Sequence, residues 1–200
     1  MRLILTGAMT ALLLALPLAS AQAESTEDKA KGTKYEAAKG LYAQGAFTIA
    51  KTNFSGGGNL DPNLGFAFAG GYRFLSWVGA DAEFYWAGRD QGNSLKTRQF
   101  GLTFNGKVYP MGLFAPKTLD SFQPYMVVGM GGGNYKFTNG GTFKNGTFIF
   151  RLGAGLDWMI TDHIGAFMDL SLHATPGTKN WVAPNGGATG VIQFGGKFNF

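Results

Sequence analysis

The chain has 200 residues, a net charge of +5, 32 glycines, 14% aromatic residues and no cysteine. The charge is too small, and its basic residues are too scattered, to indicate a nucleic-acid partner. A chain without cysteine can form neither a disulfide nor a thiolate metal site. Soluble domains average about 7% glycine, less than half of the share here. Such a composition is typical of curved transmembrane β-strands, in which glycine relieves crowding and aromatic side chains line the interfaces.

The N-terminus has the pattern of a secretory signal peptide. Met1-Arg2 supplies a positive start, an apolar run extends from Leu3 to Leu16, and Ala21-Gln22-Ala23 is a small-x-small cleavage motif. The run is shorter than the ~20 residues that span a bilayer as a helix. We therefore predict a signal peptide over residues 1–23, a polar periplasmic lead-in over 24–40 and one domain over 41–200.

From residue 41 onward, apolar and polar positions alternate in eight segments, which is the period of strands with two different faces. Segment lengths near 9–11 residues match tilted strands that cross a bilayer. The predicted strands are 41–51, 64–74, 78–86, 99–109, 124–135, 148–160, 164–172 and 190–200. The pattern predicts an all-β fold, namely an eight-stranded antiparallel up-and-down transmembrane β-barrel.

The connections between these strands alternate in length, as they do in barrels with short periplasmic turns and long extracellular loops. Tight turns are predicted at 75–76 and 161–163. Long, polar loops are predicted outside the cell at 55–63, 88–98, 136–147 and 174–188. The connection 110–122 departs from this alternation, because it is long and falls on the periplasmic side by strand count.

Charge is sorted between the two faces of the predicted strands. Apart from Lys51 at the end of the first strand, the charged residues of the predicted strands lie on the face opposite the large apolar residues. These charged residues are Arg73, Asp81, Glu83, Lys107, Arg151, Asp157, Asp169 and Lys197. Arg or Lys on a lipid-facing surface costs about 2–4 kcal/mol at the membrane midplane, so we expect these residues to face the lumen. Buried charges persist when they are paired, and we expect Glu83 and Arg151, which lie mid-strand, to matter most.

The last eight residues carry a further pattern. Gln193, Gly195, Phe198 and Phe200 stand at its polar, glycine, hydrophobic and terminal aromatic positions. The pattern resembles the C-terminal targeting signal of bacterial outer-membrane barrels, which the assembly machinery binds as an unpaired strand. The resemblance implies that barrel assembly machinery and periplasmic chaperones are partners during biogenesis.

The eight strands, the segments 105–110 and 123–131, and the closing phenylalanine resemble the OmpA/OmpX-type outer-membrane β-barrel domain family over roughly residues 40–200. The resemblance implies an integral outer-membrane protein with a structural or surface-exposed role, surrounded by lipid and lipopolysaccharide. Loops would offer the contact to an external ligand or host surface. The chain is expected to end with the barrel, without the peptidoglycan-binding domain that OmpA carries.

Eight strands enclose an interior just wide enough for side chains to fill it. We therefore predict a lumen without an open pore. The alternative is an OmpW-like conduit that moves small hydrophobic molecules along a lateral or luminal path.

Three motifs suggest enzymatic chemistry, and each has a simpler interpretation. Residues 101–107 have phosphate-loop spacing, but Val108 replaces the required Ser or Thr and the run has strand periodicity. Asp169, Ser171 and His173 are the residue types of a hydrolase triad, but neighbours at i, i+2 on a strand are separated by about 6.5–7 Å.

The third motif resembles the lipid A deacylase family PagL, whose seventh strand bears a His-x-Ser pair. His173-Ala174-Thr175 echoes that layout, with Thr175 in place of the serine and without the expected glutamate among residues 186–188. Without an orienting carboxylate, the histidine is a poor base. His163 and His173 lie at opposite ends of one strand, too far apart to share a metal ion. We expect no catalytic residue, no metal site and no cofactor.

Overall fold

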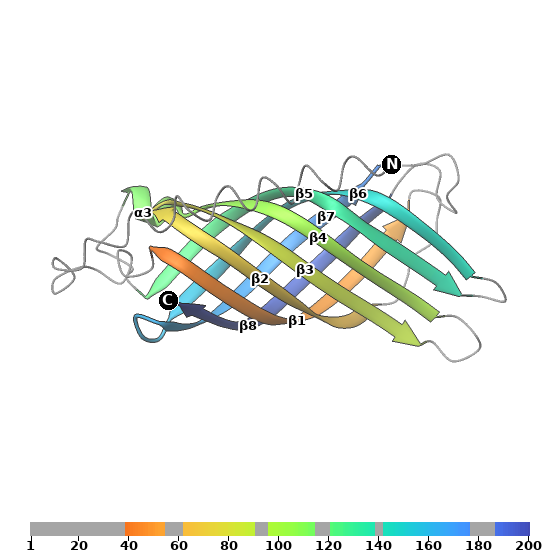
Figure 1. The fold of residues 1–200 in the computed structure, drawn as a ribbon, viewed down its shortest axis with the longest axis horizontal. Helices are drawn as coiled ribbons and strands as arrows, with labels where there is room; N and C mark the ends of the chain where they lie inside the picture. The colour runs from red at the N-terminus through yellow and green to blue at the C-terminus, as the bar shows by residue number, and fades with distance from the viewer. Residues whose placement is uncertain (1–38, 55–61, 91–95, 115–120, 139–141, 177–186) are drawn as a thin grey trace. The chain divides into compact units, whose positions relative to one another are not determined.

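The computed structural model describes residues 39–54, 62–90, 96–114, 121–138, 142–176 and 187–200. They form a closed barrel in which each strand pairs antiparallel with its neighbours in chain order (Figure 1). The strands are β1 (Gly40–Phe54), β2 (Asn63–Leu75), β3 (Val78–Asp90), β4 (Lys96–Val108), β5 (Phe122–Thr138), β6 (Thr142–Met159), β7 (Ile164–Thr175) and β8 (Gly187–Asn199). The predicted fold class and all eight strands are confirmed.

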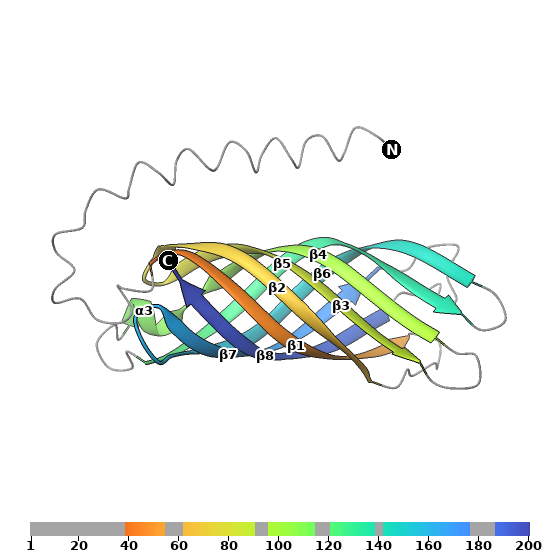
Figure 2. The ribbon, with the colours of Figure 1, turned by 60° about the horizontal axis from the view of Figure 1, so that its bottom comes forward.

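The barrel closes where β1 pairs with β8, from Tyr42 opposite Asn199 to Phe54 opposite Gly187. The backbone amide of Phe200 donates a hydrogen bond to the Leu41 carbonyl at 2.9 Å and continues this seam (Figure 2). Closure pairs every strand with a neighbour on both sides along its central part, which is the condition for a sheet in a bilayer.

The predicted bounds of two loops, 88–98 and 136–147, are wrong, because the strands continue past the apolar part of the sequence. β5 and β6 remain paired up to Thr138 and Thr142, so most of the predicted loop 136–147 is a hairpin of two strands. β3 and β4 are likewise paired up to Asp90 and Lys96. Polar side chains in these segments suggested loops, but an antiparallel ladder satisfies its backbone hydrogen bonds whether or not lipid lies beside it.

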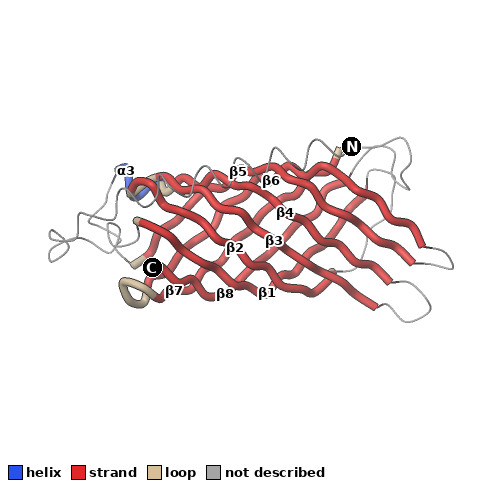
Figure 3. Tube along the Cα trace, viewed as in Figure 1, coloured by secondary structure: helices blue, strands red, loops and turns tan. Residues whose placement is uncertain are grey.

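The other end of the barrel holds both tight turns and the long connection between β4 and β5. Tyr109 follows β4 directly, and its backbone amide donates to the Trp77 carbonyl in the β2–β3 turn at 2.8 Å. The short helix α3 (Pro110–Phe114) comes next, at the same end of the barrel as the C-terminus (Figure 3). The predicted signal peptide and nearly all of the lead-in, together with most of the predicted loops 55–63 and 174–188, lie outside the described residues.

The two faces of the wall have opposite chemistry. Large apolar side chains point outward and stay exposed, such as Phe47 at 69%, Leu152 at 62% and Val128 at 62%. Inward positions hold mostly polar, charged and small residues, and nearly all of the polar ones are buried. This arrangement suits a protein whose surrounding solvent is hydrocarbon. In the part of the chain that the structure describes, no helix combines the length and hydropathy needed to cross a membrane.

Candidate functional site: the charged lumen

The lumen holds the eight charged side chains that the sequence places on the inner face. Each is at most 6% exposed, namely Arg73, Asp81, Glu83, Lys107, Arg151, Asp157, Asp169 and Lys197. They come from six of the eight strands, so their contacts run from strand to strand through the interior.

Arg151 on β6 is the centre of one group of contacts. Its Nη1 lies 2.7 Å from Oε2 of Glu83 on β3, and its Nη2 lies 2.9 Å from Oδ1 of Asp169 on β7. Gln193 donates to the second oxygen of Glu83 at 3.0 Å, and the Tyr125 hydroxyl donates to the second oxygen of Asp169 at 3.0 Å. A single guanidinium therefore links three strands, and each carboxylate has a second donor.

Asp81 on β3 is the centre of a second group. The Nζ atom of Lys107 lies 2.8 Å from Oδ2 of Asp81, and the Tyr42 hydroxyl donates to the same oxygen at 2.8 Å. Asn105 donates to Oδ1 at 2.7 Å, and Lys107 also donates to the side-chain oxygen of Gln44 at 2.9 Å. The partners of this carboxylate come from β1 and β4, so the group joins three strands.

A third group lies toward the end of the barrel that carries the tight turns. Lys197 on β8 pairs with Oδ2 of Asp157 on β6, which also accepts a hydrogen bond from the Tyr109 hydroxyl at 3.3 Å. The guanidinium of Arg73 lies 3.7 Å above the ring centroid of Tyr109, and it also donates to the side chain of Gln123. Cations above tyrosine rings gain a further electrostatic attraction.

An aromatic pair lies next to the Arg151 group, since His173 is the cross-strand partner of Arg151. The rings of Tyr85 on β3 and His173 on β7 are edge-on with their centroids 5.0 Å apart, and both side chains are fully buried. Ser171 Oγ lies 3.5 Å from Nε2 of His173, closer than the strand spacing suggested but longer than the ~2.6–3.2 Å of a working nucleophile and base. Asp169 faces Arg151 and Tyr125 instead of orienting this histidine.

The other sequence motifs are also part of the wall. Residues 101–107 lie within β4, so their backbone amides belong to the barrel ladder. Thr175, at the serine position of the deacylase pattern, donates its hydroxyl to the Gly187 carbonyl at 3.1 Å. Among the described residues, no three His, Asp or Glu side chains gather closely enough to hold a metal ion.

The four residues of the predicted assembly signal are divided between the two faces of β8. Gln193 faces the lumen and contacts Glu83, and Gly195 lies against the backbone of Gly45 and Ala46 on β1. Phe198 and Phe200 face outward, 43% and 67% exposed, with their ring centroids 5.0 Å apart.

Sequence reasoning missed one feature of the lumen, the pairing of tyrosine with glycine. Tyr42 lies opposite Gly71, and Tyr85 lies opposite Gly101 on the adjacent strand. A side chain on either glycine would overlap the tyrosine ring. The signal was present in the sequence, because these glycines stand at inward positions where a polar residue was expected. Aromatic rings that cover cross-strand glycines allow strong curvature of a sheet.

The comparisons with known proteins agree with this architecture. The family model described as "Outer membrane protein beta-barrel domain" matches residues 9–200. The chain belongs to the outer membrane protein β-barrel family. The barrel is therefore an outer-membrane barrel, and the predicted resemblance to the OmpA/OmpX-type barrel domain family is confirmed. No match was found among curated protein sequences.

Solved structures show the same fold at low sequence identity. Neisserial surface protein A is 12% identical, with a TM-score of 0.66 over 81% of this chain and 98% of that chain. Ail, the attachment invasion locus protein of Yersinia pestis, is 15% identical, with a TM-score of 0.56 over 81% and 99%. OprG from Pseudomonas aeruginosa is 16% identical, with a TM-score of 0.50 over 81% and 96%.

Proposed function

We propose that this outer-membrane barrel is closed to diffusion, catalyses no reaction, and presents the strand ends opposite its C-terminus to the outside of the cell. The observation that carries the proposal is the double ion pair of Arg151 with Glu83 and Asp169. A guanidinium that joins β3, β6 and β7 through the interior lies in the path of any solute, and its side chain is 1% exposed. Opening the lumen would separate buried charges, which costs several kcal/mol.

The structure offers little support for an OmpW-like conduit. The ladder between β7 and β8 continues to Thr175 opposite Gly187, and the ladder between β1 and β8 continues to Phe54 opposite Gly187. Behind this wall, Val191 packs with Ala50 and Ala87 in a buried cluster. A small hydrophobic molecule would have to break paired strands to leave the lumen between β7 and β8 or between β8 and β1.

The geometry also argues against a deacylase. A lipid-cleaving site must meet acyl chains at the outer surface of the barrel, whereas His173 is fully buried beneath Tyr85 and Thr175 is 6% exposed. Among the described residues, a lipid A ester bond therefore has no path to the imidazole. We interpret His173 as a residue that fills the lumen.

Export and assembly complete the proposal. The signal peptide would be removed after Ala23, and assembly machinery would bind the outward pair Phe198 and Phe200 before β8 closes against β1. In the membrane, the exposed apolar band would contact outer-membrane lipid and lipopolysaccharide. An external ligand or host surface would meet the protein at the strand ends opposite the C-terminus.

Conductance of the purified protein in planar bilayers tests the closed lumen directly. The wild-type protein should show no discrete single-channel steps. The variants Arg151→Ala and Glu83→Ala, which remove one side of an ion pair, are the positive controls for a lumen that can be opened. Regular conductance steps from the folded wild-type barrel would overturn the proposal. Release of fatty acid from lipid A by the wild type, absent in His173→Gln, would overturn its non-enzymatic part.

A further inference from the structure

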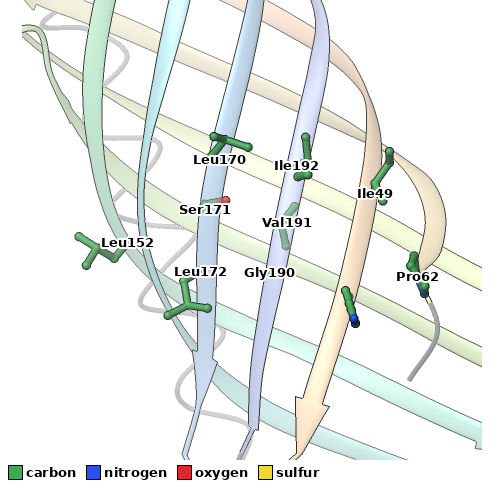
Figure 4. A pocket seen from close by; sticks show the side chains of 10 residues that line it. Ile49, Pro62, Leu152, Leu170, Ser171, Leu172, Gly190, Val191 and Ile192 are labelled. Atoms are coloured by element: carbon green, nitrogen blue, oxygen red, sulfur yellow. The ribbon is translucent and has the colours of Figure 1, made fainter. Parts of the chain in front are cut away.

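The outer face of the barrel carries a hollow of about 550 Å³ that spans β6, β7, β8 and β1. Its outward lining includes Leu152, Leu172 and Ile192, each at least 42% exposed (Figure 4). Ile49 and Leu170 lie on either side of Ile192, since both are its partners in the sheet. The hollow is therefore an apolar recess in the lipid-facing wall.

Gly190 forms the floor of this recess. It lies between Lys51 on β1 and Leu172 on β7, its two cross-strand partners. A β-carbon on Gly190 would meet one atom, the Lys51 carbonyl oxygen, at 4.0 Å. The glycine thus leaves open space between the side chains of Lys51 and Leu172, at one residue position of β8.

The rim of the recess is cationic. Lys51 is exposed and lies in the row beyond Ile49, on the side away from the barrel's C-terminal end. Pro62 completes the rim, and its carbonyl accepts a hydrogen bond from the Arg89 guanidinium at 3.3 Å. None of the described residues that line the recess is acidic. An apolar slot with one basic residue at its rim is complementary to an amphiphile with an anionic headgroup.

We propose that this recess binds one acyl chain of a phosphorylated glycolipid of the outer leaflet, of the lipid A type, with its phosphate held by Lys51. The inference rests on the topology in the proposed function, because that topology places Lys51 at the outer leaflet. The acyl chain lies across Gly190 between Leu172 and Ile49, and the phosphate lies at the level of the rim. A basic residue at the end of an apolar surface is the arrangement that attracts anionic headgroups.

Native mass spectrometry of the detergent-purified, folded barrel tests the site by titration with bisphosphorylated lipid A, dephosphorylated lipid A and phosphatidylglycerol. The wild type should retain one bisphosphorylated lipid A in preference to the other two. Gly190→Leu fills the recess and should raise the Kd for bisphosphorylated lipid A about tenfold, because the acyl chain loses the burial of roughly two methylene groups. Lys51→Gln should raise the Kd for bisphosphorylated lipid A about fivefold, as expected for one basic residue at an anionic surface, and should leave the Kd for dephosphorylated lipid A unchanged.

Two variants are matched controls. Gly196 lies on the same strand and faces outward, and a β-carbon added there would likewise meet a single atom at 4.0 Å. Gly196→Leu should therefore bind lipid A as the wild type does. Lys39→Gln makes the same charge change at an exposed position next to the start of β1, at the other end of the barrel. The site would be overturned if Gly190→Leu retained bisphosphorylated lipid A as well as the wild type does. It would also be overturned if the wild type did not prefer bisphosphorylated lipid A to phosphatidylglycerol. Conductance of the same samples reports separately on the closed lumen.

Discussion

Tyr125 on β5 and Gly155 on β6 are direct partners in the barrel wall, and the tyrosine ring fills the place where a side chain on Gly155 would stand. The hydroxyl of the same tyrosine donates a hydrogen bond to Asp169, which also pairs with Arg151. The glycine therefore does more than relieve crowding, because its missing side chain is the space from which the tyrosine reaches the ion pair.

Replacing Gly155 with alanine should destabilise the barrel. The added methyl group would push against the Tyr125 ring and the Met168 carbonyl, and overpacking of this kind typically costs about 1–3 kcal/mol. Urea unfolding in detergent, followed by tryptophan fluorescence, measures the difference. Gly106→Ala is the control, because its new β-carbon would meet a single atom at 3.9 Å. Equal midpoints for the two variants would contradict the packing argument.

Removing either side of the Arg151–Glu83 pair should destabilise the barrel strongly. Arg151→Ala and Glu83→Ala each leave a buried charge without its partner, a loss of about 3–5 kcal/mol at a pair separated by 2.7 Å. Urea unfolding of both single variants and of the double variant gives the coupling between them. The double variant should lose less free energy of unfolding than the two single variants lose together. Wild-type stability in both single variants would mean that water reaches the inner face.

The outward phenylalanine pair at the end of β8 should matter for assembly more than for stability. Phe198→Ala together with Phe200→Ala should lower the amount of folded protein in the outer membrane, because the assembly machinery reads the terminal strand before the barrel closes. Phe194→Ala is the control, since Phe194 is an exposed outward phenylalanine on the same strand. Heat-modifiable gel migration of isolated outer membranes gives the folded yield. An unchanged yield in the double variant would contradict the signal.

The absence of cysteine makes the topology measurable with single introduced thiols. Arg98 is exposed near the start of β4, and Asp162 is exposed in the turn between β6 and β7 at the other end of the barrel. Arg98→Cys should react with a membrane-impermeant maleimide on intact cells, whereas Asp162→Cys should react only after the outer membrane is opened. The reverse result would invert the barrel and move the lipid recess to the inner leaflet.

The sequence by itself determined the fold class and the face of every strand. Period-two alternation is local, and hydrocarbon on one side excludes charge from that side, so residues as far apart as Arg73 and Lys197 could be assigned to the lumen without knowledge of their contacts. Strand ends were less predictable, because polar residues such as Lys136 and Lys144 occur in loops as well as in a ladder, and here they are partners in the ladder between β5 and β6.

The tertiary structure alone decided which charges meet and where the wall is hollow. Glu83 and Arg151 are 68 positions apart in the chain, and their contact depends on barrel closure and on the stagger between strands. Sequence spacing along one strand carries no information on either. The same holds for Gly190, whose open space exists because its partners on β1 and β7 are Lys51 and Leu172. Alternation assigns a residue to a face, but register assigns its neighbours, and register is set by how all eight strands close together.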